Sequence, residues 1–392
     1  ANIIKPEQQP MRLMITLAAA AGLAACAGDS TDANADANGP TMAVESGLSL
    51  DLVADGLEFP WGMAVLPTGD LLVTEREGRL RIVRDGVLDP EPIAGTPEAY
   101  VDNQGGYLGL ALDPEFATNR LVYMAYAAGD RDSNNTSVVR GRLSAGATAL
   151  EDPEVIFESN VEKSGGAHFG GRLHFMPDGA LLVTLGDGFR WMDQAQMLDN
   201  HFGKIVRIMP DGSIPGDNPF FNEDNADPAV WTYGHRNVQG IAYEAASGTL
   251  YAHEHGPKGG DELNVIAPGN NYGWPEITYG VNYDGTVISN KTAMEGMEQP
   301  VVKWVPSIAP SGMTLYQGDM FPEWKGDLLV GAMNGPAGRK LVRIDLDDDA
   351  EPVDLLTDAG QGWRDVIEAP DGSLYLATTD LEGAVYRLSA AQ

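Results

Sequence analysis

The histidine at position 168 stands in a sequence where its ring could act on a bound molecule. Glycines flank it on both sides in the segment 165–173, GGAHFGGRL, where they permit tight turns and leave little bulk near the imidazole. Histidine is the side chain best suited to accept a proton near neutral pH. Taken alone, however, the segment is better explained by a histidine with a purely structural role.

Arg236 and Asn237 are a second pair of candidates for contacts with a polar ligand. They stand in the segment 233–240, YGHRNVQG. The arginine keeps its charge and offers a fork of donors to carboxylate or quinone oxygens, and the asparagine amide both donates and accepts. An arginine that bridges neighbouring structural elements explains the segment equally well.

The segment 254–262, EHGPKGGDE, has the composition of a loop that could bind calcium, and 269–275, GNNYGWP, follows it. Calcium takes several oxygen ligands from carboxylates, backbone carbonyls and water. A loop rich in glycine and proline can turn its carbonyls inward, while Asp261 and Glu262 add negative charge. The spacing is not that of an EF-hand, and a solvated acidic turn is an equally good explanation without further context.

These candidates are interspersed among six copies of one pattern, a tight turn followed by a short β-rich run. The copies span residues 67–74, 113–123, 177–184, 246–251, 322–330 and 370–376. Other apolar runs precede several of them, which indicates hairpins, and the copies recur at intervals of roughly 46 to 76 residues. The sequence therefore predicts an all-β protein, a six-bladed β-propeller with four-stranded antiparallel blades. A β-sandwich also uses many hairpins but gives no reason for six copies.

Loops between the repeats are the expected location of a site. The longest intervals separate the third, fourth and fifth copies, so we expect extra loops there. Loops on one face of a propeller usually build its binding site. Three weaker candidates, the polar or glycine-rich junctions 102–108, 306–312 and 362–365, also lie just before apolar strands.

The N-terminal region has the layout of an export signal. Residues 1–10 are interpreted as an upstream remnant, and 11–25 run from a single arginine into a short apolar stretch, which is typical of a signal peptide. Small residues before Cys26, the one cysteine in the chain, resemble the lipobox of bacterial lipoproteins. We expect lipid on Cys26, a flexible tether over 26–42 and one closed domain over 43–392. An ordinary secretory signal with a chance cysteine is the alternative.

The charge balance limits the partners of the protein. Its 392 residues include 57 acidic and 25 basic side chains, a net charge of −32. A surface this negative repels phosphate backbones, which disfavours nucleic acid as a partner, and it attracts cations such as calcium. No later segment is long and apolar enough to cross a membrane. We therefore expect an exported protein of the periplasm or cell envelope that touches a membrane only through lipid on Cys26.

Taken together and in order, these segments resemble one enzyme family. The phrases that carry the resemblance are WGMA (61–64), GGYLGL (105–110), HFGGRL (168–173), GHRNVQG (234–240), HGPKGGDE (255–262) and NYGWP (271–275). Over roughly residues 48–388 the chain is similar to the aldose sugar dehydrogenases that depend on pyrroloquinoline quinone (PQQ), relatives of soluble quinoprotein glucose dehydrogenase. The resemblance implies a six-bladed propeller that uses PQQ and calcium to oxidise aldoses at C1 to lactones. It also implies an external electron acceptor, which could be a quinone, a cytochrome or a dye.

The resemblance implies roles for individual residues. His168 matches the general base that deprotonates the anomeric hydroxyl so that hydride passes to the quinone, and Gln104 lies near quinone and substrate. Arg236 and Asn237 match the contacts to the quinone oxygens. Arg364 matches a basic residue that holds a PQQ carboxylate.

The resemblance also implies two calcium positions. Gly256 and Pro257 match the backbone carbonyls on the calcium that holds PQQ. Glu262 and Tyr272 match a second calcium position in the aldose branch of the family. Calcium beside a quinone would act as a Lewis acid.

The chain departs from the family where PQQ carboxylates are held. Gly362 replaces the first arginine of a G-R-x-R-D phrase, and Asn334 stands in place of a cofactor-binding lysine, with Arg339 and Lys340 nearby. Fewer matched cations would weaken the binding of a tricarboxylate. We expect Lys258 to compensate in part, and an arginine restored at position 362 to tighten binding, provided that the backbone there does not require glycine.

Two other functions remain open. A calcium-dependent propeller hydrolase such as a lactonase would share the metal, the fold and the histidine, but it would need carboxylate ligands that converge on the channel. A non-catalytic binding propeller on a lipid tether would explain the missing arginine, although the retained base and quinone contacts oppose it. The preferred sugar and the oligomeric state are not fixed by the sequence.

Overall fold

The computed structural model describes residues 41–391, except 43, 336 and 348. The expected signal peptide, Cys26 and nearly all of the expected tether lie outside the described residues. In the described part, helix is confined to α1 (Phe116–Asn119) and the 3-10 turns η1 (Met192–Gln196), η2 (Pro322–Trp324) and η3 (Thr357–Ala359). None of these helices is long and apolar enough to cross a membrane.

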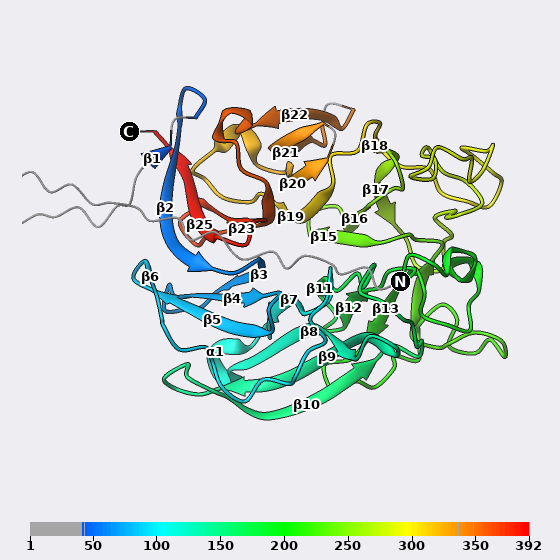
Figure 1. Ribbon diagram of the computed structural model, residues 1–392, viewed down its shortest axis with the longest axis horizontal. Helices are drawn as coiled ribbons and strands as arrows, with labels where there is room; N and C mark the ends of the chain where they lie inside the picture. Colours follow the sequence, from blue (N-terminus) through cyan, green and yellow to red (C-terminus); the bar gives the residue numbers. More distant parts are fainter. Residues whose placement is uncertain (1–40, 43, 336, 348, 392) are drawn as a thin grey trace, which may run out of the picture. The chain divides into compact units, whose positions relative to one another are not determined.

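The described residues form six antiparallel sheets, here called blades (Figure 1). Blade 1 comprises β3 (Pro60–Val65), β4 (Leu71–Glu75), β5 (Arg79–Arg84) and β6 (Val87–Leu88). Blade 2 comprises β7 (Tyr107–Leu112), β8 (Leu121–Gly129), β9 (Asn134–Leu143) and β10 (Leu150–Glu158). Blade 3 comprises β11 (Leu173–Phe175), β12 (Leu181–Thr184), β13 (Lys204–Ile208) and β14 (Val230–Tyr233).

The remaining blades follow in chain order. Blade 4 comprises β15 (Val238–Glu244), β16 (Thr249–Glu254), β17 (Asp261–Ile266) and β18 (Val302–Trp304). Blade 5 comprises β19 (Pro310–Leu315), β20 (Leu328–Gly335), β21 (Gly338–Asp345) and β22 (Glu351–Leu355). Blade 6 combines both ends of the domain: β23 (Trp363–Glu368), β24 (Leu374–Thr378), β25 (Gly383–Ala390), β2 (Leu48–Leu57) and β1 (Thr41–Met42).

The innermost strands close the blades into a ring (Figure 1). β3 contacts β7, β7 contacts β11, and the series continues through β15, β19 and β23 back to β3. The ring is completed when β2 pairs with β25, from Leu48 opposite Ala390 to Leu57 opposite Gly383. The predicted six-bladed β-propeller with four-stranded antiparallel blades is confirmed, and β1 adds a two-residue fifth strand to blade 6.

The recurring sequence pattern forms the turn between the first and second strands of a blade. In blade 1 the N–H groups of Leu66 and Gly69 donate to the carbonyls of Asp70 and Leu66, each at 2.8 Å. Gly69 has φ of 91°, and Gly179 and Gly372 hold the same place in blades 3 and 6 with φ of 85° and 81°. Glycine adopts this left-handed conformation without a steric penalty. The pattern therefore recurs because each blade needs the same turn.

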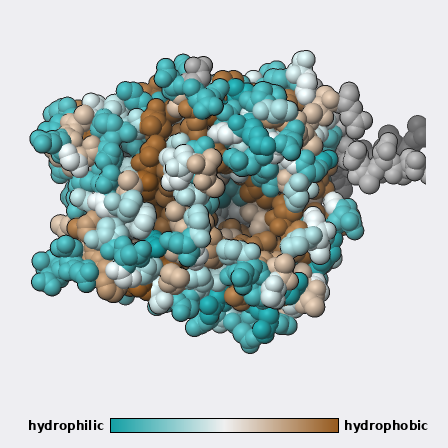
Figure 2. Space-filling view, turned by 180° about the vertical axis from the view of Figure 1, so that it is seen from behind, coloured by the Kyte–Doolittle hydropathy of each residue, from teal (hydrophilic) through white to brown (hydrophobic). Residues whose placement is uncertain are grey.

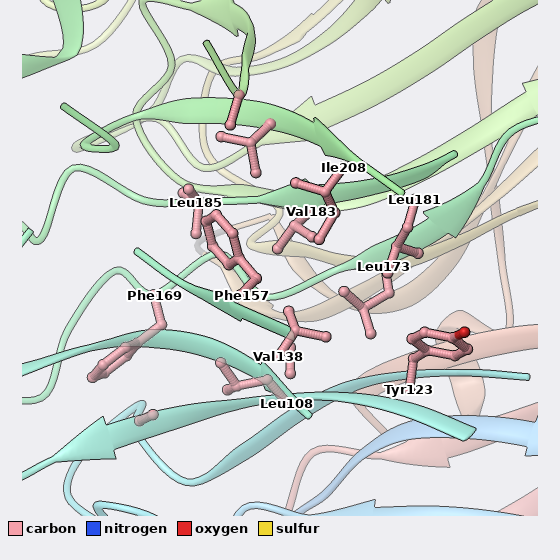
Figure 3. Close-up of a cluster of buried hydrophobic side chains, with 14 of the residues drawn as sticks. Leu108, Tyr123, Val138, Phe157, Phe169, Leu173, Leu181, Val183, Leu185 and Ile208 are labelled. Carbon is pink, nitrogen blue, oxygen red and sulfur yellow. The ribbon is translucent and has the colours of Figure 1, made fainter. Parts of the chain in front are cut away.

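Apolar side chains pack between neighbouring blades and fix their relative orientation. Figure 3 shows the cluster between blades 2 and 3, where Tyr123, Val138 and Phe157 meet Leu181 and Ile208. Burial of such side chains is the main stabilising contribution to a fold of this kind. Because every blade is clamped on both faces, the ends of the inner strands are held in place around the ring axis.

Long connections in blades 3 and 4 carry the extra residues that the uneven repeat spacing predicts. Residues 185–203 join β12 to β13, 209–229 join β13 to β14, and 267–301 join β17 to β18. Figure 2 shows one face of the molecule hollowed near its middle, with hydrophobic residues exposed around the hollow.

Candidate functional site

Three cavities share lining residues. The central cavity, about 610 Å³ and partly open to solvent, is lined by residues that include Trp61, Arg76, Gln104, Asn237, Gln239, His255, Met333, Arg364 and Thr379. The histidine cavity, about 730 Å³, includes Gln104, Ser164, His168, Phe189, Arg190 and Tyr283. The acidic cavity, about 250 Å³, includes Arg236, Glu254, His255, Gly256, Glu262 and Tyr272. Gln104 joins the first two cavities, and His255 joins the first and third.

His168 is paired with a carboxylate. Its Nδ1 lies 2.6 Å from Asp187 Oδ1, and its backbone N–H donates to Gln104 Oε1 at 2.8 Å. Asp187 also accepts hydrogen bonds from the Phe189 N–H and from Trp274 Nε1, both at 2.8 Å. An ionised Asp187 holds the proton of a neutral imidazole on Nδ1, so Nε2 is left as an acceptor.

The electrostatics of this pair favour a neutral histidine. Burial lowers the pKa of His168, the positive charge of Arg236 lowers it further, and the interaction with Asp187 only partly opposes them. Burial by itself would raise the pKa of Asp187, but the hydrogen bond with His168 and the nearby Arg236 bring it below its ordinary value. The pair therefore consists of a neutral base and a charged carboxylate near pH 7.

A glycine allows the chain to pass between His168 and Asn237. A Cβ atom on Gly186 would lie 2.3 Å from the His168 carbonyl oxygen and 2.8 Å from Asn237 Oδ1. Gly186 and Asn237 form a bridge between the end of β12 and the start of β15, and Asn237 Oδ1 accepts a hydrogen bond from the Gly170 N–H at 3.1 Å. The base and the amide are therefore fixed to the same stretch of backbone.

Arg236 faces the acidic cavity. Its Nη1 donates to the carbonyls of His255 and Gly256 at 3.0 and 2.7 Å, and its backbone N–H donates to Glu254 Oε2. Glu254 Oε1 in turn contacts His235 Nδ1 at 2.9 Å. The GHRN segment is thus both a link between blades 3 and 4 and part of a cavity wall.

Arg364 and Arg76 line the central cavity together. The Arg364 guanidinium lies 4.1 Å above the Trp61 ring, and its Nη2 donates to Gln239 Oε1 at 2.9 Å. Burial, and then the charge of Arg172, holds the pKa of Arg364 well below its ordinary value. Arg76 lies 3.9 Å above the Phe59 ring. In the described part of the chain, no carboxylate forms a direct ion pair with either cavity arginine.

The other expected cations do not reach the central cavity. Lys258 is exposed, its backbone N–H is bonded to the carbonyl of Val281 at 2.9 Å, and its side chain does not line any of the three cavities, although its loop lines the acidic cavity. Arg339 is paired with Asp380 at 3.0 Å and Lys340 with Asp354 at 2.8 Å. The expectation that Lys258 compensates for a missing arginine is therefore not supported. Asn334 lies in β20, and its side chain is outside the described part of the structure.

Position 362 does not accept an arginine. A Cβ atom on Gly362 would lie 2.0 Å from the Met333 carbonyl oxygen and 2.7 Å from Thr379 Cγ2. Any side chain there would force the backbone of β20 to move. The condition for an arginine at this position to tighten binding, a backbone that does not require glycine, is therefore not met.

The acidic cavity holds the residues expected at a calcium site. Burial and the nearby Glu254 raise the pKa of Glu262 to about 8, and its carboxylate accepts a long hydrogen bond, 3.5 Å, from the Asn264 side-chain amide. Tyr272 lines the same cavity, but its hydroxyl donates to the Val265 carbonyl at 2.9 Å. Among the described residues, no group of three or more His, Cys, Asp or Glu side chains gathers as a metal site. A cation here would therefore need backbone carbonyls such as that of Gly256, with Pro257 buried beside it.

Comparison with known proteins places the chain in a family. The sequence profile described as "Glucose / Sorbosone dehydrogenase" matches residues 57–387. The chain belongs to the glucose/sorbosone dehydrogenase family. The expected resemblance, and with it membership of an oxidoreductase family, is confirmed.

Several named proteins are similar to this chain over most of its length. The aldose sugar dehydrogenase YliI of Escherichia coli is 39% identical and covers 87% of this chain and 93% of its own. A crystal structure of a glucose dehydrogenase superposes with a TM-score of 0.84 at 42% identity, over 87% of this chain and 99% of its own. The PQQ-bound aldose sugar dehydrogenase of Streptomyces coelicolor superposes with a TM-score of 0.71 at 30% identity, over 89% of this chain and all of its own.

The structure also brings in two residues that the sequence interpretation missed, Asp187 and Arg76. Each follows the second strand of its blade, in the continuation of the repeated pattern: 177–184 leads to Asp187, and 67–74 leads to Arg76. The position reached by Arg76 in blade 1 corresponds to His255, Met333 and Thr379 in blades 4, 5 and 6, and all four line the central cavity. Alignment of the repeats would have identified this position.

Proposed function

We propose that this protein oxidises aldoses at C1 to lactones, with PQQ as the electron-accepting cofactor and calcium as its partner. The observation that carries the proposal is the buried His168–Asp187 pair, joined through Gln104 to a cavity in which two arginines lack a direct carboxylate partner among the described residues. A base and a site that attracts an anion thus lie side by side. The PQQ-bound relative and the family profile support the same conclusion.

The central cavity fits an anionic, planar cofactor. The two guanidiniums form no direct ion pair within the described part of the chain, so they repel each other in one cavity, and an anion between them would relieve this repulsion. Arg364 and Arg76 would hold the carboxylates of PQQ, while Asn237 would contact its quinone oxygens. When bound, PQQ supplies the electrophilic centre that accepts the hydride.

The acidic cavity fits a divalent cation. Two carboxylates, Glu254 and Glu262, line one small space, and the Glu262 carboxylate accepts a long hydrogen bond, 3.5 Å, from Asn264. Calcium accepts a mixed set of carboxylate and carbonyl oxygens. At Gly256, the oxygen already accepts a hydrogen bond from Arg236, so a calcium ion on that atom would compete with Arg236 or use the remaining lone pair.

His168 Nε2 would take the proton of the anomeric hydroxyl. The imidazole is available as a base because burial keeps it neutral. Asp187 fixes the ring through Nδ1 and stabilises the imidazolium once it forms. Gln104 accepts a hydrogen bond from the His168 backbone N–H and lines both the central and the histidine cavity. It would therefore keep the substrate correctly positioned relative to the cofactor.

We further propose that the enzyme acts outside the cytoplasm and passes electrons to an external quinone or cytochrome. The support is the signal-like sequence 11–25 and the small residues before Cys26, which resemble a lipobox. Mass spectrometry of the native protein should find a diacylglyceryl group on Cys26. Release of a Cys26→Ala variant from membranes is expected, and an unmodified mature N-terminus after Cys26 would contradict it.

The central experiment separates cofactor binding from chemistry. Purified protein is titrated with PQQ at fixed calcium, and reduction of a redox dye is then followed with glucose. His168→Gln should bind PQQ nearly as tightly as the wild type but turn over more slowly by on the order of 10² or more. Failure of the wild type to bind PQQ would favour a binding propeller instead, and lactone hydrolysis without dye reduction would favour a hydrolase.

A further inference from the structure

Two exposed aromatic rings stand at the mouth of the histidine cavity. The side chains of Phe189 and Tyr283 belong to residues that are 49% and 61% exposed, and their rings stack with centroids 6.2 Å apart and planes at 27°. The Phe189 ring also makes a T-shaped contact with the His168 imidazole, with ring centroids 5.2 Å apart and planes at 83°. The rings thus lead outward from the buried imidazole to solvent.

Packing does not explain where Phe189 is held. Its φ is 73°, in the left-handed region that side chains other than glycine rarely adopt, and its ring gains little burial in return. The conformation is fixed by the hydrogen bond from the Phe189 N–H to Asp187 Oδ1 at 2.8 Å. The carboxylate that orients the base therefore also presents this aromatic ring. Strained residues of this kind concentrate at functional sites.

Tyr283 reaches the same cavity from a different blade. It lies in the connection 267–301 of blade 4, whereas Phe189 lies in the connection 185–203 of blade 3. Arg190, also exposed, lines the cavity beside them and offers several hydrogen-bond donors. Two of the longest loops in the described residues therefore converge on one amphipathic platform with aromatic faces and a polar edge.

We propose that Phe189 and Tyr283 form a stacking subsite for a second sugar ring, the one attached to the ring that is oxidised. A pyranose has an apolar C–H face and hydroxyls around its edge, which match an aromatic face bordered by Arg190. The ring whose C1 reacts must reach His168 at the inner end of the platform. Tyr283, at the solvent end, is then left for the next ring of a reducing disaccharide or oligosaccharide. This inference rests on the proposed aldose oxidation.

The charge of the protein narrows the class of sugar. The net charge of −32 disfavours anionic saccharides over long range. The platform itself presents one cation and no carboxylate among the residues that line the histidine cavity. The subsite therefore suits neutral reducing oligosaccharides.

The test compares glucose with maltotriose in PQQ-loaded protein. Tyr283→Ala should raise KM for maltotriose about 2- to 10-fold, the scale of an aromatic contact of about 0.5–1.5 kcal/mol. KM for glucose and kcat for both sugars should change less than 2-fold. Tyr283→Phe should restore the maltotriose KM, because it keeps the ring. Phe221→Ala removes another exposed ring, 40% exposed and away from the cavity, and should change nothing.

A second measurement does not depend on turnover. Maltotriitol cannot be oxidised at C1 and is titrated calorimetrically into wild-type and Tyr283→Ala protein, with and without PQQ. Weaker binding by the variant supports the subsite. Equal binding, together with an unchanged ratio of maltotriose to glucose KM, would overturn it, and so would a change confined to the KM of the electron acceptor. Absence of PQQ binding would refute the proposed function but not the subsite, which the maltotriitol titration judges separately.

Discussion

Replacement of Arg76 by glutamine should affect the protein in opposite directions with and without its cofactor. Arg76 and Arg364 face one cavity, and no described carboxylate pairs directly with either of them. In the cofactor-free protein, each guanidinium is therefore repelled by the other. In the complex, each would contact a carboxylate of PQQ. Arg76→Gln should stabilise the first state and destabilise the second.

The expected loss of PQQ affinity in each variant depends on how deeply the replaced arginine is buried. A hydrogen bond to a charged group contributes about 1.5–3 kcal/mol, which corresponds to about 10- to 150-fold in the dissociation constant of PQQ. Arg364 is the more deeply buried and already oriented by Gln239 and Trp61, so Arg364→Gln should lie near the upper end of that range. Arg76 is partly exposed, so Arg76→Gln should lie near the lower end. Relief of about 1 kcal/mol of repulsion should raise the cofactor-free Tm by about 1–2 °C in a domain of this size.

The assay has two arms and one control. PQQ is titrated into each cofactor-free variant at fixed calcium and salt, because salt screens the long-range charge, and Tm is measured without PQQ. Arg142→Gln removes the same charge from an exposed ion pair on β9 and should leave PQQ affinity unchanged. If Arg76→Gln binds PQQ as tightly as the wild type, Arg76 is not part of the carboxylate site. A lower Tm would show that Arg76 stabilises the fold instead.

Three further outcomes are expected. Because burial lowers the pKa of His168, kcat/KM should stay constant down to about pH 6.5, the ordinary pKa of histidine, and fall only at lower pH. Asp187→Asn should move this fall in kcat/KM to still lower pH and reduce turnover by on the order of 10² or more. A fall that already begins above pH 7 in the wild type would contradict a neutral His168. Calcium at about 100 times its dissociation constant should stabilise the protein by about 2.7 kcal/mol. In thermal unfolding at increasing calcium, Glu262→Gln should abolish this gain, while the control Glu244→Gln should keep it. Equal calcium dependence in both variants would exclude the acidic cavity as the calcium site. Gly362→Ala should lower the free energy of unfolding by about 1–3 kcal/mol, since its Cβ would overlap the Met333 carbonyl, and urea titration of a variant as stable as the wild type would disprove the overlap.

Most of the fold could be predicted from the six repeats, because each copy encodes a turn that every blade needs. The glycine of the pattern, Gly69 in blade 1 and Gly179 in blade 3, marks the link between the first and second strands. Six such marks predict six blades. The closure by β2 could not be read in this way, because its partner β25 lies at the other end of the domain and no local pattern links them.

The site was predictable only where one segment carries its own signature. His168 and Asn237 stand in recognisable phrases, and the structure places them within reach of one stretch of backbone. The partner of the base, Asp187, and the second cation, Arg76, depend on which loops meet at the ring axis, and this is a property of the closed ring. Charge alone misled the interpretation of Lys258, because an exposed lysine in a cavity-forming loop need not point into the cavity.

The pairing of β2 with β25 brings the two ends of the domain together, so the chain could be circularly permuted. The Ala391 N–H donates to the Gly47 carbonyl at 2.9 Å, so the two ends of the domain lie side by side on blade 6. A circular permutant with a short linker across these ends and new termini between Leu57 and Pro60 would encode every blade as one uninterrupted stretch. Its mean contact separation would be lower, which favours faster folding. It would also lose the chain connection from β2 of blade 6 to β3 of blade 1, so packing between the two blades would have to hold that join and the ring would open more readily there.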